Sequence, residues 1–392
     1  PIGLPERIEE YYLDRSTGSY QLLKKIVNAY SPQGKVLHQE HYGSDGQYAY
    51  TLHWEYDDLG NVTKEVNAIG EATVYRYDQN GNKIEEQGPD LFFHKKFVYD
   101  LANRLIKEKE VWSNGGSLKI THQHNTLNQR IATVDIHGHE TKYKFDAFGH
   151  PIHGYYPAIY SANNTLTPVE EKRHYDSLGN VKTLWDANGN QTNTFYTIRG
   201  KPYLIQYPNG SSERKYYSLD GLLEKEIGKN GLVTTYTHDA LGQVIQTQIH
   251  DQQGNLLKVT SSVYHGTKLI SETDANGNIT YYEYDGAGRK IATIRDSHVT
   301  KYVYDSLGRI IRTTESLNGQ DVSTAVKEYD LLNRVIAEYL EDSSGKQFQK
   351  EEFRYHPNGK RTHVIAHTEA GLATTLTTYT PHGEIASITD PL

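Results

Sequence analysis

Histidine and aspartate are the residue types of this chain whose spacing could support chemistry. Among the 19 histidines, His122 with His124 and His137 with His139 are paired at i and i+2. Such residues share one face of a β-strand, so each pair could chelate a metal ion. Two imidazoles without a carboxylate cluster form a weak site, however, and Gly138 places a turn within the second pair. We therefore predict neither a metal site nor another bound cofactor.

Regularly spaced aspartates could serve as paired catalytic acids or as calcium ligands. Each is followed three residues later by glycine or asparagine, as Asp57 is by Gly60. In a turn, such an aspartate accepts hydrogen bonds from backbone N–H groups two or three residues on, and we interpret it in this way. Catalytic acids must instead converge in a cleft, whereas a repeat distributes its carboxylates along a rim. Because Gly-x-Ser-x-Gly is also absent, we predict no catalytic residue.

These aspartates belong to a motif, Tyr-Asp-x-x-Gly, that recurs along nearly the whole chain. Four consecutive copies, strict or loose, start at residues 175, 196, 217 and 238, in steps of 21. A fixed period of this size indicates one supersecondary unit copied many times. Looser copies also begin at Tyr30, His124, Tyr264, Tyr355 and Tyr379. We assign a structural role to the motif residues Tyr56, Asp57, Gly60, Tyr77, Asp78, Gly81, Tyr99, Asp100, Asn103, Phe145, Asp146, Gly149, Tyr175, Asp176, Gly179, Tyr284, Asp285, Gly288, Tyr304, Asp305, Gly308, Tyr329, Asp330 and Asn333.

Each repeat predicts two antiparallel strands joined by turns. Rings two residues apart, such as Tyr302 and Tyr304, would share one face of the first strand. The glycine or asparagine that ends the motif suits a positive φ. Isoleucine often follows three places later, as Ile311 does, and favours a second strand. A second turn follows in several repeats, and its Asn-Gly pair, for example Asn188-Gly189, is a strong hairpin signal.

The fold class predicted is all-β, with tandem antiparallel hairpins in a curved or spiral β-sheet ribbon that forms a partial or complete hollow shell. We expect one continuous body over residues 1–392, with about 16 repeats and on the order of thirty strands. Proline and asparagine predict a surface loop at residues 154–170. Shorter loops are expected at 316–323 and 113–117.

Composition excludes several classes of function. The net charge of -8, from 41 basic and 49 acidic residues, argues against a nucleic-acid partner. Without cysteine there is no disulfide, thiol nucleophile or cysteine-ligated zinc site. No apolar stretch approaches the roughly 20 residues of a membrane-spanning helix. Because the sequence begins with proline and contains no methionine, we expect it to be a piece of a longer polypeptide.

The repeats resemble those of the YD-repeat, or rearrangement-hot-spot (RHS), proteins. The resemblance covers about Tyr30 to Gly383, and the string from Tyr304 to Arg309 is highly specific to that family. In the family, such repeats form a ribbon that winds into a hollow shell around a polypeptide, often a toxin, in bacterial toxin complexes and RHS effectors. Related shells in animal teneurins serve cell adhesion. The chain ends at Asp390-Pro391-Leu392 without the core segment and catalytic aspartates of the self-cleaving members, so we expect no autoproteolysis.

The resemblance implies a non-enzymatic scaffold, part of a β-shell that encapsulates or carries a toxin-like polypeptide. The expected partners are this cargo or further repeat segments of the parent protein, and the expected location is secreted or cell-surface. The alternative is an adhesion or carbohydrate-binding module that uses the outer aromatic face of the sheet to bind a sugar or a cell-surface receptor. Inward-facing aromatic rings would favour cargo, and outward-facing rings would favour such a ligand.

Overall fold

The computed structural model describes residues 3–14, 17–89, 94–111, 116–160, 164–380 and 384–391. Within these ranges the chain forms 33 strands and no helix, and the strands belong to one sheet. Each recorded pairing joins two strands that follow one another in the sequence, and each is antiparallel, as for β1 with β2 and β32 with β33. The all-β class and the tandem antiparallel hairpins predicted from the sequence are confirmed. No helix in the described ranges is long and apolar enough to cross a membrane.

The chain groups into two compact units. Unit 1 comprises Pro1–Phe97, Lys109–Ser117 and Thr280–Leu392, and unit 2 comprises Val98–Glu108 and Leu118–Ile279. The single continuous body expected from the sequence stays a prediction. Unit 1 holds β1 (Arg7–Asp14), β2 (Ser19–Tyr30), β3 (Val36–Tyr42), β4 (Tyr48–Tyr56), β5 (Val62–Val66), β6 (Ala72–Tyr77), β7 (Lys83–Gln87), β25 (Lys290–Arg295), β26 (His298–Tyr304), β27 (Ile310–Leu317), β28 (Gln320–Tyr329), β29 (Val335–Glu341), β30 (Gln347–Tyr355), β31 (Arg361–Thr368), β32 (Gly371–Tyr379) and β33 (Ile385–Thr389).

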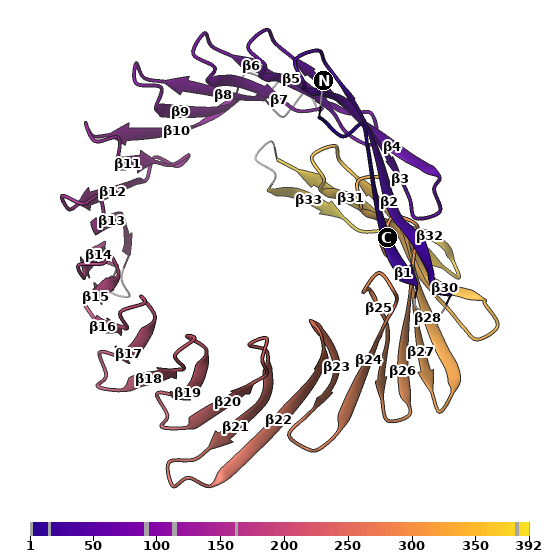
Figure 1. The fold of residues 1–392 in the computed structure, drawn as a ribbon. Coiled ribbons are helices and arrows are strands. Elements are labelled where there is room, and N and C mark those ends of the chain that lie inside the picture. Colours follow the sequence, from indigo (N-terminus) through magenta and orange to yellow (C-terminus); the bar gives the residue numbers. More distant parts are fainter. Residues whose placement is uncertain are drawn as a thin grey trace. The chain divides into compact units, whose positions relative to one another are not determined.

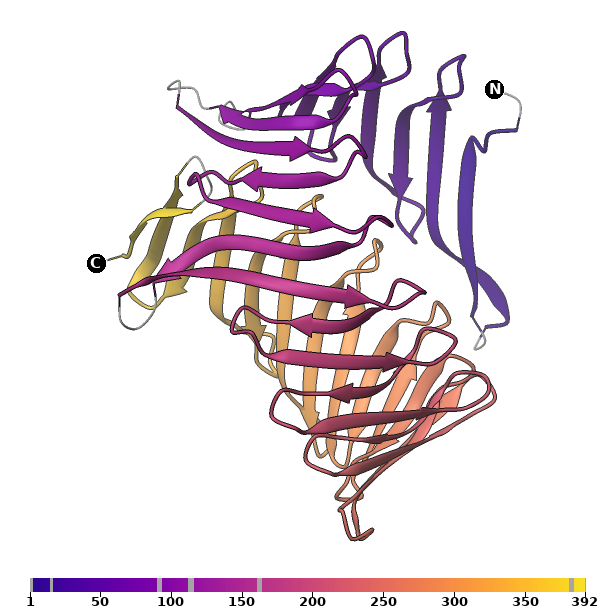
Figure 2. The same ribbon diagram turned by 90° about the vertical axis from the view of Figure 1, so that its left-hand side faces the viewer.

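Unit 2 is a meander of consecutive strands that lie side by side, drawn mainly in magenta in Figure 2. It holds β11 (Arg130–Val134), β12 (Glu140–Phe145), β13 (Pro151–Tyr160), β14 (Leu166–Tyr175), β15 (Val181–Trp185), β16 (Gln191–Tyr196), β17 (Pro202–Gln206), β18 (Ser212–Tyr217), β19 (Leu223–Ile227), β20 (Val233–His238), β21 (Val244–His250), β22 (Leu256–His265) and β23 (Lys268–Thr273). Unit boundaries fall within or beside β8 (His94–Tyr99), β9 (Leu105–Val111), β10 (Ser117–His124) and β24 (Ile279–Tyr284).

Turns alternate between the two edges of this meander. The motif turns, such as 176–179, lie on one edge, which we name the YD edge. The second turns, such as 186–189, lie on the other, which we name the opposite edge. Successive motif turns are therefore separated by two strands.

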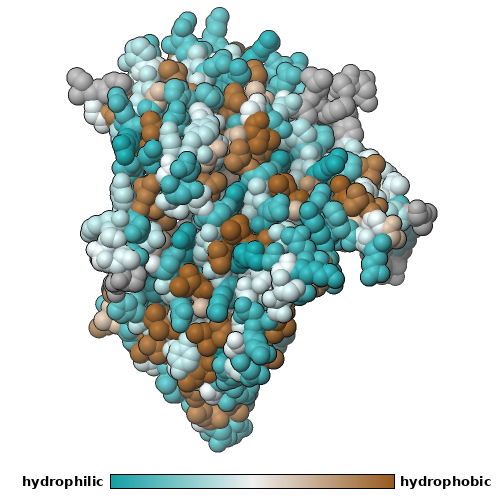
Figure 3. All heavy atoms as spheres, turned by 90° about the vertical axis from the view of Figure 1, so that its right-hand side faces the viewer, coloured by the Kyte–Doolittle hydropathy of each residue, from teal (hydrophilic) through white to brown (hydrophobic). Residues whose placement is uncertain are grey.

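The sheet is a single layer with little buried surface. In β6, Tyr75 and Tyr77 are half-buried while Val74 and Arg76 are exposed, which is the alternation predicted for rings on one face. No described side chain is completely buried. Figure 3 shows apolar side chains interspersed with polar ones over the face that it presents. The buried apolar residues, which keep between 2% and 8% of their surface exposed, are Ala132, Ala292, Val326, Ala337, Phe353 and Ile365.

A β-bulge lies beside the motif tyrosine in most of the hairpins. Tyr304 pairs with Ile310 and Val303 pairs with Arg312, so Ile311 is an extra residue on its strand. Ile84 is extra in the same way between Lys83 and Glu85. A bulge bends its strand and increases the local twist. The isoleucine predicted to start a regular strand therefore marks the bulge.

The long loop predicted at 154–170 is wrong. Residues 151–160 and 166–175 are the paired strands β13 and β14, and the connection includes residues 161–163, which lie outside the described ranges. The register shifts between Tyr156 and Ile159, around Pro157. Proline is tolerated at such a bulge because the ladder there needs no N–H donor, so proline did not mark a break in the sheet.

The loop predicted at 316–323 is wrong as well. Leu317 pairs with Gln320 across a two-residue hairpin turn made by Asn318 and Gly319, whose φ angles are 52° and 78°. Asn-Gly favours this turn because both positions require positive φ. Of the third predicted loop, residues 113–115 lie outside the described ranges and Ser117 begins β10.

Candidate functional site

The motif turn is the local structure from which the candidate site is built. In the copy at 176–180, Asp176 Oδ1 accepts the backbone N–H groups of Leu178 and Asn180, each at 2.9 Å. Asn180 Nδ2 also donates to Asp176 Oδ2 at 3.0 Å. The side-chain bond from Asn180, followed by the backbone N–H bonds, lowers the pKa of Asp176. The sequence predicted capping of N–H groups two or three residues after the aspartate. Capping of the N–H two residues on is confirmed, but the other capped N–H is four residues on.

The turn glycine has the positive φ that the sequence predicts. Gly179 has a φ of 83°, and its N–H donates to the Asp176 carbonyl at 3.1 Å. Asn103 and Asn333 fill the same slot with φ angles of 59° and 67°. Positive φ is also found at Gly60, Gly81, Gly149, Gly288 and Gly308. Backbone N–H groups are capped likewise by Asp57, Asp78, Asp100, Asp146, Asp285, Asp305 and Asp330.

Tyrosine hydroxyls connect many of the repeats to the preceding repeat, which sequence reasoning missed. Tyr175 Oη donates to the carbonyl of Pro151 at 2.9 Å, and Pro151 is the first residue of the preceding repeat's second strand. Phe145 ends β12 in the corresponding place without a hydroxyl, and Tyr77, Tyr99 and Tyr284 end β6, β8 and β24. Equivalent bonds join Tyr56 to Val36, Tyr196 to Val181, Tyr217 to Pro202, Tyr304 to Lys290, Tyr329 to Ile310, Tyr355 to Val335 and Tyr379 to Arg361.

The residue after the turn glycine forms a second connection between repeats. Arg309 Nε donates to Asp305 Oδ2 at 2.6 Å, and its Nη1 donates to the Asp330 carbonyl at 2.7 Å. Its guanidinium carbon lies 4.9 Å from the ring centroid of Tyr329, a cation–π contact with the next repeat. The signal for this contact is in the sequence, because a cation or ring often follows the glycine. Similar ring contacts are made by Arg289, Arg334, Lys201, Lys360 and His150.

Within unit 1, the first strands lie against the motif turns at 285–288, 305–308 and 330–333 (Figure 1). We name this contact the seam. The Ser44 N–H donates to the Ser306 carbonyl at 2.8 Å. A Cβ on Gly43 would lie 2.6 Å from Ser306 Oγ. Glycine therefore permits the close approach of the two segments.

Gly286 is the second close approach in the seam. A Cβ there would lie 2.6 Å from Cδ2 of Tyr12 and 2.9 Å from the backbone oxygen of Leu13. The latter atom belongs to the main chain, so it cannot move away as a flexible side chain could. Sequence reasoning missed this role of Gly286, although the combination Asp-Gly-Ala-Gly departs from the bulkier central residues of other copies.

The seam encloses an open pocket of about 630 Å³. Leu307 and Leu332 from the motif turns line it together with Leu23 and Leu52 from the first strands. His41 is stacked on Tyr50 with ring centroids 4.5 Å apart. Burial, with Lys24 nearby, lowers the pKa of His41. The contact thus combines apolar packing, a stacked ring pair and a backbone hydrogen bond.

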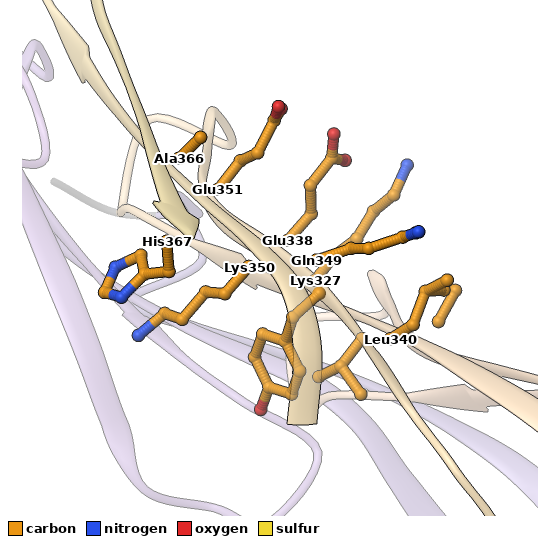
Figure 4. Close-up of a pocket in the computed structure, with 11 residues that line it drawn as sticks. Lys327, Glu338, Leu340, Gln349, Lys350, Glu351, Ala366 and His367 are labelled. Atoms are coloured by element: carbon orange, nitrogen blue, oxygen red, sulfur yellow. The ribbon is translucent and has the colours of Figure 1, made fainter. Parts of the chain in front are cut away.

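A second pocket, of about 530 Å³, lies on β28 to β31 (Figure 4). The Glu338 and Glu351 carboxylates point to one side of the sheet, while Lys350 and His367 point to the other. Lys350 Nζ and His367 Nε2 each lie 3.0 Å from Glu352 Oε1. The Glu338 and Glu351 carboxylates therefore lie apart from the His367 imidazole, which is paired with Glu352 instead.

The histidine pairs do not form a metal centre in the described residues. His122 is buried, with Nδ1 3.1 Å from Thr133 Oγ1 and Nε2 3.0 Å from Glu108 Oε1. His139 Nδ1 lies 3.3 Å from Asp135 Oδ2, and its ring centroid is 5.9 Å from that of His137. The described ranges contain no group of three or more His, Cys, Asp or Glu residues arranged to hold a metal ion.

These features define a class of protein: a ribbon of repeated β-hairpins whose motif residues cap turns and tie neighbouring repeats together. Residues 56–90 match the model of the RHS Repeat family. The resemblance to the YD-repeat, or RHS, proteins is thereby confirmed for these residues, which match an RHS repeat.

The chain is also similar to known proteins and to a solved structure. The chain is 23% identical over 248 residues to "Probable deoxyribonuclease RhsB" of Dickeya dadantii (strain 3937), covering 63% of this chain and 16% of that protein. It is 24% identical over 267 residues to "Toxin subunit YenC2" of Yersinia entomophaga, covering 59% and 26%. The crystal structure of TcdB2-TccC3-TEV aligns with a TM-score of 0.77 at 16% identity, over 98% of this chain and 23% of that one. The chain therefore shares its fold with part of a much longer protein.

Proposed function

We propose that this chain is a non-enzymatic wall segment that encloses a toxin-like polypeptide. The observation that carries the proposal is the shared fold with TcdB2-TccC3-TEV over 98% of the chain. The similar proteins include one whose name describes it as a toxin subunit. A toxin-related scaffold that acts in a secreted assembly accounts for both findings.

The local structure suits a wall. The strands are paired in sequence order, and the motif turns join each repeat to the next through hydroxyls, cations and rings. Such an array grows without a central core because each repeat contacts its neighbours. The aspartates already cap turns, and His122 and His139 are already within hydrogen-bond distance of side chains in the sheet, so we assign them no chemistry. Because consecutive strands are hydrogen-bonded to one another, the ribbon also offers few sites at which a protease could bind an extended segment.

The proposed partner is a polypeptide cargo or a further repeat segment of the parent protein. Nucleic acid is not proposed as a partner, because the net charge is -8. The adhesion and carbohydrate-binding alternative is not favoured, since the names of similar proteins and of a similar structure refer to toxins.

Protease protection tests the proposal. The full 392-residue chain is fused at its C-terminus to an unstructured passenger, and cleavage of the passenger is followed by mass spectrometry beside the free passenger. We expect the fused passenger to be cleaved more slowly. The Gly286→Val variant, in which the seam is disrupted, should lose that protection, whereas Ala147→Val, at the same turn position in unit 2, should retain it. Equal cleavage of the free and fused passengers would count against enclosure.

A further inference from the structure

Unit 2 carries a regular row of exposed apolar side chains on its YD edge. Each comes from one of the two central residues of a motif turn, and the exposed fractions run from 67% for Leu241 to 107% for Leu101. We name these residues the exposed turn row. The row consists of Leu101, Leu127, Phe148, Leu178, Ile198, Leu219 and Leu241.

Single exposed apolar residues are common on protein surfaces and need no explanation. This set differs because each of seven consecutive motif turns has one such residue at one of its two central positions, where polar residues are the usual choice. Neighbouring motif turns are two strands apart, so they are spaced by roughly 10 Å along the ribbon. Six such steps make a line of roughly 60 Å, which is long enough for a specific interface.

The seam in unit 1 shows what covers such turns. Leu307 and Leu332 occupy the same turn positions as the exposed row, but they are only partly exposed because the first strands of the chain lie against them. The covering segment includes the turn Gly43–Gln47, which is on the opposite edge of its own hairpin. A YD edge therefore packs against the opposite edge of another stretch of the same ribbon.

The occupant must match the spacing of the row, and a ribbon of this repeat does so because its opposite-edge turns are also two strands apart. Docking would not leave the turn carboxylates buried without hydrogen-bond partners. Asp146 and Asp176 accept two backbone N–H groups each, and a further side chain contacts their second oxygen. Burying these satisfied groups avoids the penalty of an unpaired charge.

Unit 2 itself presents the matching surface. Its opposite edge carries the turns at 135–138, 186–189, 207–210, 228–231, 251–254 and 274–277. We propose that the exposed turn row docks on the opposite edge of unit 2 in a second copy of this chain. The contact uses two different surfaces and is therefore heterologous, so it can extend from copy to copy. It does not depend on whether the chain encloses a polypeptide.

Sedimentation velocity of the full chain over a range of concentrations tests the proposal. We expect concentration-dependent association. The triple variant Phe148→Asn, Ile198→Asn and Leu219→Asn should weaken it at least about tenfold. Asparagine suits these turns, so the variant should keep the thermal transition of the natural chain. A matched control removes three exposed apolar residues from strand faces, Val263→Thr, Val303→Thr and Val322→Thr, and should associate as the natural chain does.

Photo-crosslinking from position 148 identifies the docked surface. Crosslinks between copies to residues 135–139, 186–190 or 207–211 would support docking on the opposite edge. A chain that stays monomeric at every concentration would overturn the proposal. So would association that the triple variant leaves unchanged, or crosslinks confined to the row of the other copy or to strand faces.

Discussion

The motif turns at Asp305 in unit 1 and Asp176 in unit 2 share nearly the same local geometry. Asp305 Oδ1 accepts the N–H groups of Leu307 at 3.0 Å and of Arg309 at 2.9 Å, and the corresponding distances at Asp176 are both 2.9 Å. The glycine of each turn has a φ of 83°. Yet Leu178 is 68% exposed, whereas Leu307 lines the seam.

The difference between the two regions therefore lies in what covers the turns. The residues that build the turn are alike in both regions. At one point of the cover in unit 1, Gly286 permits a close approach, since it lies against Tyr12 and the backbone of Leu13. The motif thus sets local structure but does not determine the cover, because the two central residues are Ser-Leu in both the Asp305 and the Asp176 turns.

The largest expected effect comes from substituting the residue that permits this approach. Gly286→Val would place a side chain against the Leu13 backbone oxygen, so the free energy of unfolding should fall by about 1–3 kcal/mol. Hydrogen exchange should show lost protection in β1 to β4, because these strands separate from the turns. The matched variant Ala147→Val, in the exposed turn at Asp146, should change the stability by less than about 0.5 kcal/mol. Equal effects of the two variants would contradict the seam.

The turn glycines should respond similarly in the two regions, because the need for a positive φ is local; a Cβ on Gly179 would also lie 3.0 Å from Nε2 of the His150 side chain. Gly308→Val and Gly179→Val should each lower the free energy of unfolding by about 1–2 kcal/mol, since valine is strained at positive φ. Gly308→Asn and Gly179→Asn should be much milder, as asparagine already fills this slot at Asn333. Urea denaturation of the four variants measures these differences. An unchanged stability for Gly308→Val would show that this turn does not need a positive φ.

The sequence was sufficient to predict the features that depend on neighbouring residues. Tyr302 and Tyr304 predicted a strand, Asp305 predicted a cap and Gly308 predicted a positive φ, because each follows from local geometry. The bulge at Ile311 was missed because a register shift belongs to a pair of strands rather than to either one.

Contacts between residues that are far apart in the sequence could not be predicted from the motif. The Tyr175 hydroxyl binds the carbonyl of Pro151, and nothing in the motif itself names that acceptor. Ser44 and Ser306 meet only because the ribbon brings the start of the chain beside a much later repeat. Proline misled the prediction at 154–170, since a bulge around Pro157 keeps that region within the sheet.

Tyrosine hydroxyls allow a test with a smaller expected effect on stability. Tyr175 and Phe145 both lie in unit 2, so the difference between covered and uncovered turns does not enter. Tyr175→Phe removes the bond to the Pro151 carbonyl and should cost about 1 kcal/mol. Phe145→Tyr offers the reverse change, and we expect a gain of about 0.5–1 kcal/mol from a new bond to the preceding repeat. Thermal and urea unfolding of both variants measures the two changes in the free energy of unfolding. If Tyr175→Phe is neutral, the hydroxyl bonds do not contribute to the cohesion of the ribbon.

The smallest effect at neutral pH is expected from the charge of a single turn carboxylate. The pKa of folded Asp176 lies below its ordinary value of 3.8, so the carboxylate contributes stability that is present at neutral pH and is lost as the pH falls through the folded pKa. Asp176→Asn keeps Oδ1 as an acceptor, as Asn125 Oδ1 does for Leu127 and Gln129, but it does not titrate.

The natural chain should therefore be slightly more stable than Asp176→Asn at pH 7, and the gap should close below about pH 4. The reciprocal variant Asn125→Asp should introduce the same acid sensitivity in a turn that lacks it. Thermal unfolding of the three proteins between pH 7 and pH 3 measures both changes. A gap that stays constant across this range would mean that the turn needs only the geometry of the acceptor oxygen, and that its negative charge adds nothing to the stability of the ribbon.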